Sequence, residues 1–244
     1  MKYYKVVDDL NKEVVIDTNK SNYGSILPEY ENYLPFLKYV TTSSKKLNLP
    51  LDLYISMNNK LALFGDLYIE ELASNNYGGN FPLDKLTGNT NHKNKFIEGF
   101  MLVEVLKGLR NLEFDLFGEG FYLWEYIYEI VRKANFLECP NRLKSFYLFE
   151  KLSDCEYYIN THKGMGFVCE VELIETKSLF KGDMNLLDNI QNHNTFTQVE
   201  KIVEDYWSGK SSSKPVIEII FQGKCKLKPL YRLIKNGDKL IKIN

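Results

Sequence analysis

The chain has 244 residues, of which 44% are hydrophobic and 14% aromatic, so it can bury a core without disulfides or a structural metal. Its formal net charge of −1 excludes a global field that would attract nucleic acid or an anionic membrane. The sequence has no run of about 18 apolar residues and no apolar N-terminal segment. We therefore expect a cytoplasmic protein that does not contact membranes.

The first elements that the sequence predicts are two short strands. Residues 2–7 (KYYKVV) and 13–17 (EVVID) are rich in Tyr and Val, with Asp, Asn and Lys between them. A turn that contains Gly24 and Pro28 follows.

Residues 28–137 are predicted to be mostly helical. Apolar residues at spacings of 3, 4 and 7 predict helices over residues 95–110 and 120–136. Residues 49–73 are expected to be helical with a break at Met57, Asn58 and Asn59, and residues 73–91 to form a polar loop.

From residue 145 onward the pattern alternates between strand and helix. Strands are predicted at 145–149, 166–174, 216–221 and 224–234, the last two paired around Gln222 and Gly223. Capping boxes at residues 153–156 and 197–200 predict helices over 154–160 and 197–207, the second ending at Gly209. This order predicts an α+β fold with a helical insertion.

Histidines and cysteines are the first candidates for metal binding or nucleophilic chemistry. The histidines are far apart in the sequence, and the cysteines form no C-x-x-C pair. We therefore expect solvated loop histidines, no metal site, and free thiols buried in the core. The residues concerned are His92, His162, His193, Cys139, Cys155, Cys169 and Cys225.

Two basic segments suggest phosphate or nucleic-acid binding. Residues 209–211 (GKS) resemble the end of a P-loop, but Glu204 stands where that motif requires glycine, so we reject this interpretation. Lys224, Lys226 and Lys228 alternate along one predicted strand face. They indicate a solvated edge that resists aggregation or, as the minority interpretation, a nucleic-acid contact.

Arg142 is a candidate for binding a small anionic ligand. It follows Pro140 and Asn141 at the entrance to a predicted strand, and Ser145 lies three residues further on. The planar fork of a guanidinium suits phosphate or carboxylate groups. The alternative, which the sequence alone favours, is an ion pair with a helix acid such as Glu125 or Glu129.

Glu218 is a candidate for a buried functional carboxylate. Strand alternation groups it with Val216 and Ile220 on a face that is otherwise apolar. A charge on such a face is costly unless it is paired or used in chemistry. The equally weighted alternative is an edge strand on which Glu218 faces water.

Four blocks resemble a family of small bacterial proteins, a domain of unknown function assigned to the ADP-ribosyltransferase-like fold. The blocks are YYKVVDD, LWEYIYEIVRKANFLECPNRLKSFYLFEKLSDCEYYIN, GFVCEVEL and DYWSGKSSSKPVIEIIFQGKCKL. Together they cover about residues 1–30 and 120–235. The resemblance implies a single domain over residues 1–244, with a split mixed sheet and a mostly helical insertion at about 28–120 for target recognition.

The resemblance also implies that the protein binds NAD, as a substrate, in a cleft of the sheet. Glu218 would be the catalytic carboxylate that favours the cationic sugar as nicotinamide leaves. Arg142 and Ser145 would hold phosphate and ribose, and Tyr206 or Trp207 would stack on nicotinamide. The residues of the cofactor site would be Tyr4, Lys5, Arg142, Ser145, Tyr206 and Trp207.

The sequence departs from the family pattern at two of these places. Lys5 stands where the superfamily usually has His or Arg, and Asn141 replaces the usual Ser of the middle motif. A lysine can still meet an anion, but as a point charge without the planar fork of arginine.

We therefore expect an ADP-ribosyltransferase-like glycosyltransferase that moves ADP-ribose from NAD to an unidentified protein or nucleic-acid acceptor. Proteins of this kind act in bacterial conflict as toxins or phage-related effectors. One alternative is a non-catalytic protein-interaction module on the same scaffold. Another is a nucleic-acid-binding protein that uses the lysine-rich C-terminal face.

Overall fold

The computed structural model describes residues 2–9, 12–23, 30–76, 79–112, 116–118, 120–236 and 239–243. Contacts divide the chain into two compact units. Unit 1 contains residues 1–26, 129–189 and 203–244, and unit 2 contains residues 27–128 and 190–202. The boundary falls inside two helices, α6 (Gly120–Asn135) and α9 (Phe196–Trp207). The insertion expected at 28–120 lies in unit 2, and the single domain stays a prediction.

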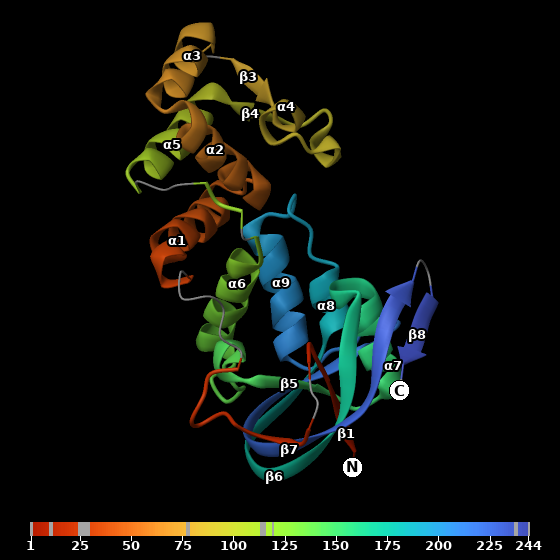
Figure 1. Ribbon diagram of the computed structural model, residues 1–244. Helices are drawn as coiled ribbons and strands as arrows, with labels where there is room; N and C mark the ends of the chain where they lie inside the picture. Colours follow the sequence, from red (N-terminus) through yellow and green to blue (C-terminus); the bar gives the residue numbers. More distant parts are fainter. Residues whose placement is uncertain are drawn as a thin grey trace. The chain divides into compact units, whose positions relative to one another are not determined.

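Unit 2 is built mainly from helices (Figure 1). They are α1 (Tyr30–Leu47), α2 (Leu51–Phe64), α3 (Asp66–Asn76), α4 (Leu83–Thr87), the 3-10 helix η1 (Thr90–His92) and α5 (Gly99–Arg110). Strands β3 (Asn80–Pro82) and β4 (Phe96–Glu98) form a small antiparallel sheet. The central helix is α2, which packs against α1, α3, α4 and α5 and buries Leu53, Tyr54 and Met57.

Three predictions for unit 2 are corrected by the structure. The helix expected over 49–73 breaks at Gly65, not at residues 57–59, because Gly65 adopts a positive φ of 60° that glycine tolerates. The helix expected over 95–110 begins only at Gly99, since residues 96–98 pair with 80–82. The predicted polar loop over 73–91 contains β3, α4 and η1.

Unit 1 is built on a six-stranded sheet whose two long strands are β6 (Met165–Asp183) and β7 (Ile217–Asn236). The shorter strands are β1 (Tyr3–Val7), β2 (Val14–Asp17), β5 (Phe146–Phe149) and β8 (Lys239–Ile243). The strand order is β2-β7-β5-β1-β6, and β6 also pairs with β7, so the pairings close a ring (Figure 1).

The fold class is α+β, as predicted. The expected mixture of parallel and antiparallel strands is wrong for the part of the chain that the structure describes, where every pairing between strands is antiparallel. No helix among the described residues is both long and apolar enough to cross a membrane.

The two C-terminal strands that were expected around Gln222 and Gly223 are one continuous strand. β7 runs through both residues and pairs with β6 on either side of them. A Cβ at Gly223 would lie 2.1 Å from the carbonyl oxygen of Glu175, so this glycine marks a close approach between strands and not a turn. The strand predicted at 166–174 is likewise only the first half of β6.

Helix starts differ from the two predicted capping boxes. α7 (Leu152–Tyr158) follows Lys151, so the box expected at Ser153 is wrong. At α9, the Gln198 side chain accepts from the Thr195 backbone N–H, which moves the capping interaction two residues earlier. Gly209 follows α9 with a φ of 76°, as its predicted C-terminal role requires.

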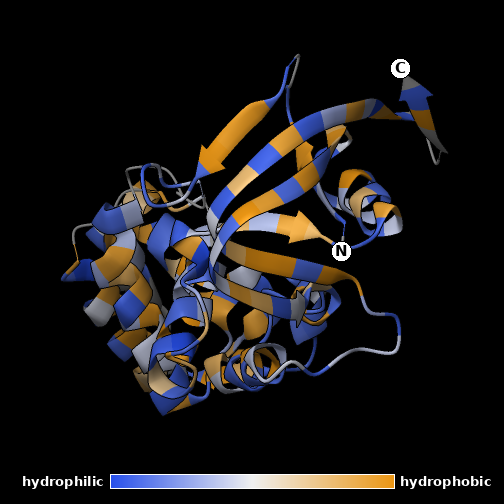
Figure 2. Cartoon of the chain, turned by 90° about the horizontal axis from the view of Figure 1, so that it is seen from below, coloured by the Kyte–Doolittle hydropathy of each residue, from blue (hydrophilic) through white to orange (hydrophobic). Residues whose placement is uncertain are grey.

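Buried apolar side chains lie on both faces of the sheet of unit 1, since successive residues of a strand point to opposite faces. Figure 2 shows hydrophobic and hydrophilic residues following one another along its strands. The inner cluster consists of Tyr3, Ile16, Phe146, Leu148, Cys169, Val171, Ile219, Phe221, Cys225 and Leu227. The outer cluster consists of Val6, Phe149, Cys155, Ile159, Val168, Met184, Val216 and Leu233. The outer cluster includes side chains of α7, the π-helix η3 (Ile159–Lys163) and α8 (Met184–Asp188). A charged side chain on either face therefore needs a physical explanation.

Candidate functional site

Glu218 lies inside the sheet and not at its edge. Glu218 belongs to β7 and pairs with Phe149 of β5 on one side and with Gly182 of β6 on the other. It shares its face with Val216 and Ile220, which are buried, and is itself 6% exposed. The edge-strand alternative is therefore wrong, and the carboxylate lies on an apolar face as the alternation predicted.

Arg142 reaches Glu218 from a segment 76 residues earlier in the chain. It opens the short 3-10 helix η2 (Arg142–Lys144), just before β5. Its Nη1 donates to Glu218 Oε1 at 2.6 Å, and the residue is 8% exposed. Its guanidinium carbon lies 5.0 Å from the centre of the Tyr147 ring. An acid on a helix, Glu125 or Glu129, was predicted as the partner of Arg142. The acid that it contacts at 2.6 Å is Glu218, which lies in strand β7.

Tyr206, near the C-terminal end of α9, contacts both charged groups. Its hydroxyl donates to Glu218 Oε1 at 2.7 Å and accepts from Arg142 Nη1 at 2.8 Å. Burial, and then the negative charge of Glu218, raise the pKa of Tyr206 well above its ordinary value, so the phenol keeps its proton. We call Glu218, Arg142 and Tyr206 the Glu218 cluster.

A glycine makes room for the Tyr206 ring. Gly182 lies opposite Glu218 in the β6–β7 register, and a Cβ at this position would come within 2.3 Å of the ring. Any side chain there would therefore push the hydroxyl away from the carboxylate. Gly182 was not predicted to belong to the site, although an isolated glycine among residues that form strands is a signal of close approach.

The loop before β5 fixes Arg142 through its own hydrogen bonds. Asn141 Oδ1 accepts from the Leu143 backbone N–H at 2.8 Å, and the Tyr147 hydroxyl donates to the Arg142 carbonyl at 2.9 Å. Ser145 is fully buried, and its hydroxyl donates to the Asn141 carbonyl at 2.6 Å. Ser145 therefore closes the loop, and the predicted contact with ribose would require this bond to break.

A second buried ion pair lies at the C-terminal end of α6. Arg132 Nε and Nη2 donate to the two carboxylate oxygens of Glu129 at 2.8 and 3.0 Å. Arg132 Nη1 also donates to the Cys139 carbonyl at 2.8 Å, and Asn141 Nδ2 donates to Glu129 at 3.2 Å. This pair connects the helix to the loop that carries Arg142, and it uses one of the two helix acids proposed as partners of Arg142.

Tyr4 and Lys5 lie on opposite faces of the sheet. Tyr4 pairs with Phe149, which pairs with Glu218, so Tyr4 stands in the same row and on the same face as the carboxylate. Lys5 faces the inner cluster, because successive strand residues alternate between faces, and its Nζ lies 4.6 Å from the centre of the Phe146 ring. Of the two residues, Tyr4 therefore lies on the same face as Glu218 and Lys5 on the other, and their shared role in a cofactor site stays a prediction.

The comparison with known families concerns the same part of the chain. Residues 119–232 match the family described as Protein of unknown function (DUF2441). The matched residues include the Glu218 cluster and Gly182, whereas Tyr4 and Lys5 lie outside them. A search of curated proteins found no match.

Trp207 is packed against other aromatic rings of unit 1. It is 2% exposed, and its ring centre lies 5.0 Å from that of Phe180. Tyr206 is also fully buried, with its ring centre 5.6 Å from that of Phe180. Stacking of either residue on nicotinamide, as predicted, would therefore have to replace a contact with a protein ring.

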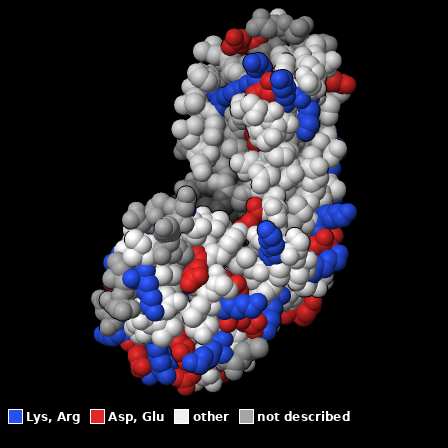
Figure 3. All heavy atoms as spheres, turned by 90° about the vertical axis from the view of Figure 1, so that its right-hand side faces the viewer, with Lys and Arg blue, Asp and Glu red and all other residues white. Residues whose placement is uncertain are grey.

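The three lysines of β7 stand beside acidic residues. Lys226 and Lys228 form ion pairs, and Lys224 has acidic neighbours on both adjacent strands. The acids are Glu13, Glu172, Asp17 and Glu175. Figure 3 shows basic and acidic side chains interspersed on one face of unit 1. These acids compensate the positive charge of the three lysines. Nucleic-acid binding, which would need an uncompensated positive face, stays a prediction.

The histidines and cysteines were predicted with mixed success. His92 is buried, with Nε2 2.9 Å from Asp52 Oδ1, so it is not a solvated loop residue. The cysteines are free thiols, and all except Cys139 are buried as predicted. Burial raises the pKa of Cys169 to about 11 and of Cys225 to about 12, which disfavours nucleophilic thiolates. Within the described residues, no cluster of three or more His, Cys, Asp or Glu side chains could hold a metal ion.

Proposed function

We propose that the protein binds NAD and transfers ADP-ribose from it, with the Glu218 cluster as the reaction centre and an ADP-ribosyltransferase-like fold in unit 1. The observation that carries this proposal is a buried carboxylate held by a guanidinium and a phenol from two other elements of the chain. The order of the resembling blocks, three of which lie within the residues that match the DUF2441 family, also supports it.

Stability alone is a poor explanation for the Glu218 cluster. Removing two charges from water costs several kcal/mol per ion, and apolar residues of similar volume often stabilise a protein as well or better. Buried charges that retain specific partners are therefore candidates for functional sites. The cluster lies on an apolar face, where an aliphatic residue at position 218 would satisfy packing without any partner.

In the proposed reaction, the bond between the ribose C1′ and the nicotinamide nitrogen breaks, and its electron pair leaves with nicotinamide. Positive charge then develops on the sugar, and a fixed carboxylate beside it stabilises that charge. The acceptor, a protein or nucleic-acid nucleophile, forms the new bond to C1′ and releases a proton. Glu218 would stabilise the sugar, and Tyr206 would orient Glu218 through its hydrogen bond.

Arg142 would change partners when NAD binds. Its guanidinium neutralises Glu218 in the structure, and both residues are more than nine-tenths buried. A pyrophosphate offers the bidentate geometry that a guanidinium prefers, so NAD would draw Arg142 away and leave the carboxylate beside the ribose. The proposal therefore requires these side chains to part before chemistry begins.

The direct test is release of nicotinamide from NAD by the full-length protein and by Glu218→Gln. We expect release by the wild type and a loss on the order of a hundredfold or more in the variant, because the neutral amide no longer stabilises the cationic sugar. The NAD-induced rise in melting temperature should persist in Glu218→Gln, since binding stabilises the folded state by mass action.

A matched control is Glu129→Gln, which neutralises the other buried carboxylate bound by an arginine. It should lower stability while changing release per folded molecule far less than Glu218→Gln. If the wild type neither releases nicotinamide nor gains stability from NAD, the proposal fails. The second candidate, a non-catalytic interaction module, would then be favoured, because Arg142 already neutralises Glu218 without a ligand.

A further inference from the structure

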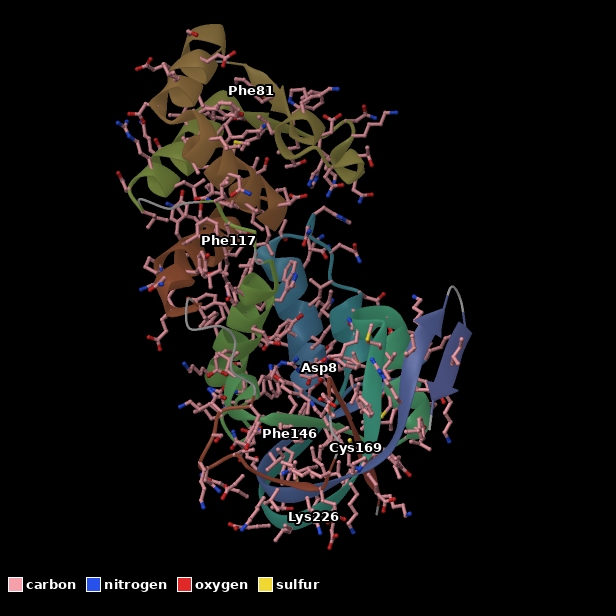
Figure 4. The ribbon with its side chains drawn as sticks, in the orientation of Figure 1. Asp8, Phe81, Phe117, Phe146, Cys169 and Lys226 are labelled. Carbon is pink, nitrogen blue, oxygen red and sulfur yellow. The ribbon has the colours of Figure 1, made fainter. Side chains whose placement is uncertain are left out.

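Lys5 is a lysine whose side chain enters an apolar face of the sheet. It stands between Tyr3 and Val7 on β1 and lies directly opposite Cys169 of β6. The neighbours that share its face belong to the inner cluster, among them Phe146 and Cys169, which are labelled in Figure 4. The residue is partly exposed, but its amine end is buried among these neighbours, so a small carbonyl compound would have to enter between them to react.

The amine of Lys5 has aromatic neighbours and no acidic partner among the residues that the structure describes. Its Nζ lies 4.6 Å from the centre of the Phe146 ring and 5.8 Å from that of Tyr147. Cationic contact with rings gives partial compensation for the lost water, but less than a carboxylate would give. This arrangement leaves the protonated amine poorly solvated.

Five ionisable groups act on this amine from the elements around it. Burial, and then the positive charge of one of them, lower the pKa of Lys5 from 10.5 to about 8, while Glu218 opposes the shift. The groups are Lys163, Cys155, Glu218, Cys225 and Cys169. At pH 7.5 roughly a quarter of Lys5 side chains would be neutral, compared with about one in a thousand for an ordinary lysine.

We propose that Lys5 is a nucleophilic amine that condenses with the carbonyl group of a small aldehyde or ketone. The nitrogen lone pair attacks the carbonyl carbon, the carbon–oxygen bond breaks, and the oxygen leaves as water with both amine protons, so an imine forms without oxidation or reduction. Desolvated lysines are suited to this chemistry. The apolar neighbours keep water away from the carbon–nitrogen double bond, which slows its hydrolysis.

This inference is independent of NAD transfer. Lys5 and Glu218 lie on opposite faces of the sheet, so a carbonyl compound at Lys5 would not occupy the Glu218 cluster. Failure of either proposal leaves the other standing, because the two are measured with different reagents.

The test is site-resolved trapping on the full-length protein. Acetaldehyde with cyanoborohydride reduces each imine to a stable ethyl-lysine, which peptide mass spectrometry quantifies from pH 6.5 to 10. The internal reference is Lys38, an exposed lysine of α1. We expect Lys5 to be modified at least about tenfold faster than Lys38 at pH 7.5, with a rate that levels off near pH 8.

Two substitutions separate reactivity from folding. Lys5→Arg keeps the positive charge but cannot form an imine, and Lys5→Met removes the charge and keeps the volume. Both should remain folded and lose the modified peptide, while labelling of Lys38 is unchanged. A Lys5 rate that equals or falls below that of Lys38, or one that keeps rising toward pH 10, would overturn the proposal.

Discussion

Unit 1 contains two buried glutamate–arginine pairs that are alike in chemistry and different in construction. Glu129 and Arg132 are three residues apart on α6, and their pairing follows from the geometry of a single helix. Glu218 and Arg142 are 76 residues apart and meet only because β5 and β7 are neighbours in the sheet. The first pair is a local product of secondary structure, and the second is a product of the whole fold.

The difference shows which buried charges deserve a functional hypothesis. Glu129 has further polar partners in Asn141 and Lys133, and its arginine ties down a loop by donating to a backbone carbonyl. That pair has a sufficient structural role. Glu218 lies on an apolar face, accepts a hydrogen bond from Tyr206 and is paired with Gly182 across the sheet. Packing alone does not require a carboxylate at this position.

The largest expected effect comes from breaking the remote pair at its arginine. Arg142→Met leaves Glu218 buried with the Tyr206 hydroxyl as its remaining hydrogen bond among those described, so we expect a loss of about 3–5 kcal/mol in the free energy of unfolding. Arg132→Met should cost less, because Glu129 keeps Asn141 and Lys133. Urea denaturation of both variants measures the difference.

A double substitution checks that the loss comes from an uncompensated charge. Arg142→Met combined with Glu218→Gln should recover part of the lost stability, because the buried group is then neutral. If Arg132→Met is the more damaging single change, the distinction between a local and a remote pair is wrong.

Gly182→Ala should have the next largest effect. Its Cβ would lie 2.3 Å from the Tyr206 ring, so the ring must move, and overpacking of this kind costs about 1–3 kcal/mol. Gly118→Ala is the matched control, since a Cβ there meets nothing within 4 Å. Equal melting temperatures for the two variants would show that the ring does not depend on the glycine.

Lys5→Met should stabilise the protein, because the Lys5 amine lies among apolar side chains without an acidic partner among the described residues, whereas Glu129 and Glu218 each pair with an arginine. The folded pKa of about 8 lies below the ordinary 10.5, so the folded state binds fewer protons than the unfolded state between these values. The burial penalty is therefore complete below pH 8 and disappears as the pH rises to 10.5. We expect a gain of roughly 2 kcal/mol at pH 7, reduced by the remaining contact with water and rings.

Denaturation at pH 7 and pH 10 distinguishes this explanation from simple packing. The gain from Lys5→Met should be largest at pH 7 and small at pH 10. An equal gain in unfolding free energy at both pH values would mean that methionine packs better than lysine. The burial of the Lys5 charge would then not be the cause of the gain.

Tyr206→Phe should have the smallest effect. It removes one hydroxyl from the Glu218 cluster and leaves the ion pair in place, so we expect a loss of about 1 kcal/mol. Thermal unfolding measures it. A loss as large as that of Arg142→Met would indicate that the phenol, and not the guanidinium, keeps the carboxylate buried.

Local periodicity predicted the long amphipathic helices and the short strands β1, β2 and β5 well, and it failed at the long strand β7. α6 and α9 were predicted to within about a residue, because each carries a long amphipathic pattern. β7 was predicted as two strands, because Gly223 has the signature of a turn in the sequence and only its close approach to Glu175 explains it. Register shifts in β6 near that glycine have no signal in residue type.

The candidate site was predictable in its members more than in its geometry. The alternation of Val216, Glu218 and Ile220 correctly predicted a carboxylate on an apolar face. That Arg142 would contact this carboxylate could not be predicted, because it depends on the pairing of β5 with β7. The sequence predicted Tyr4 and Lys5 in one cofactor site, and only the strand register shows that Tyr4, and not Lys5, lies on the face of Glu218.

The ring of pairings in unit 1 has a consequence for how the protein folds. The N-terminal strand β1 pairs with β5 and β6, where Tyr4 lies opposite Phe149 and Glu170. These partners are far along the chain, so β1 cannot pair until they have been synthesised. Folding of unit 1 should accordingly be slow, since long loops must close before those contacts form. Before β7 is synthesised, the backbone groups of β5 and β6 that later pair with it are exposed, and they can pair with strands of other nascent chains.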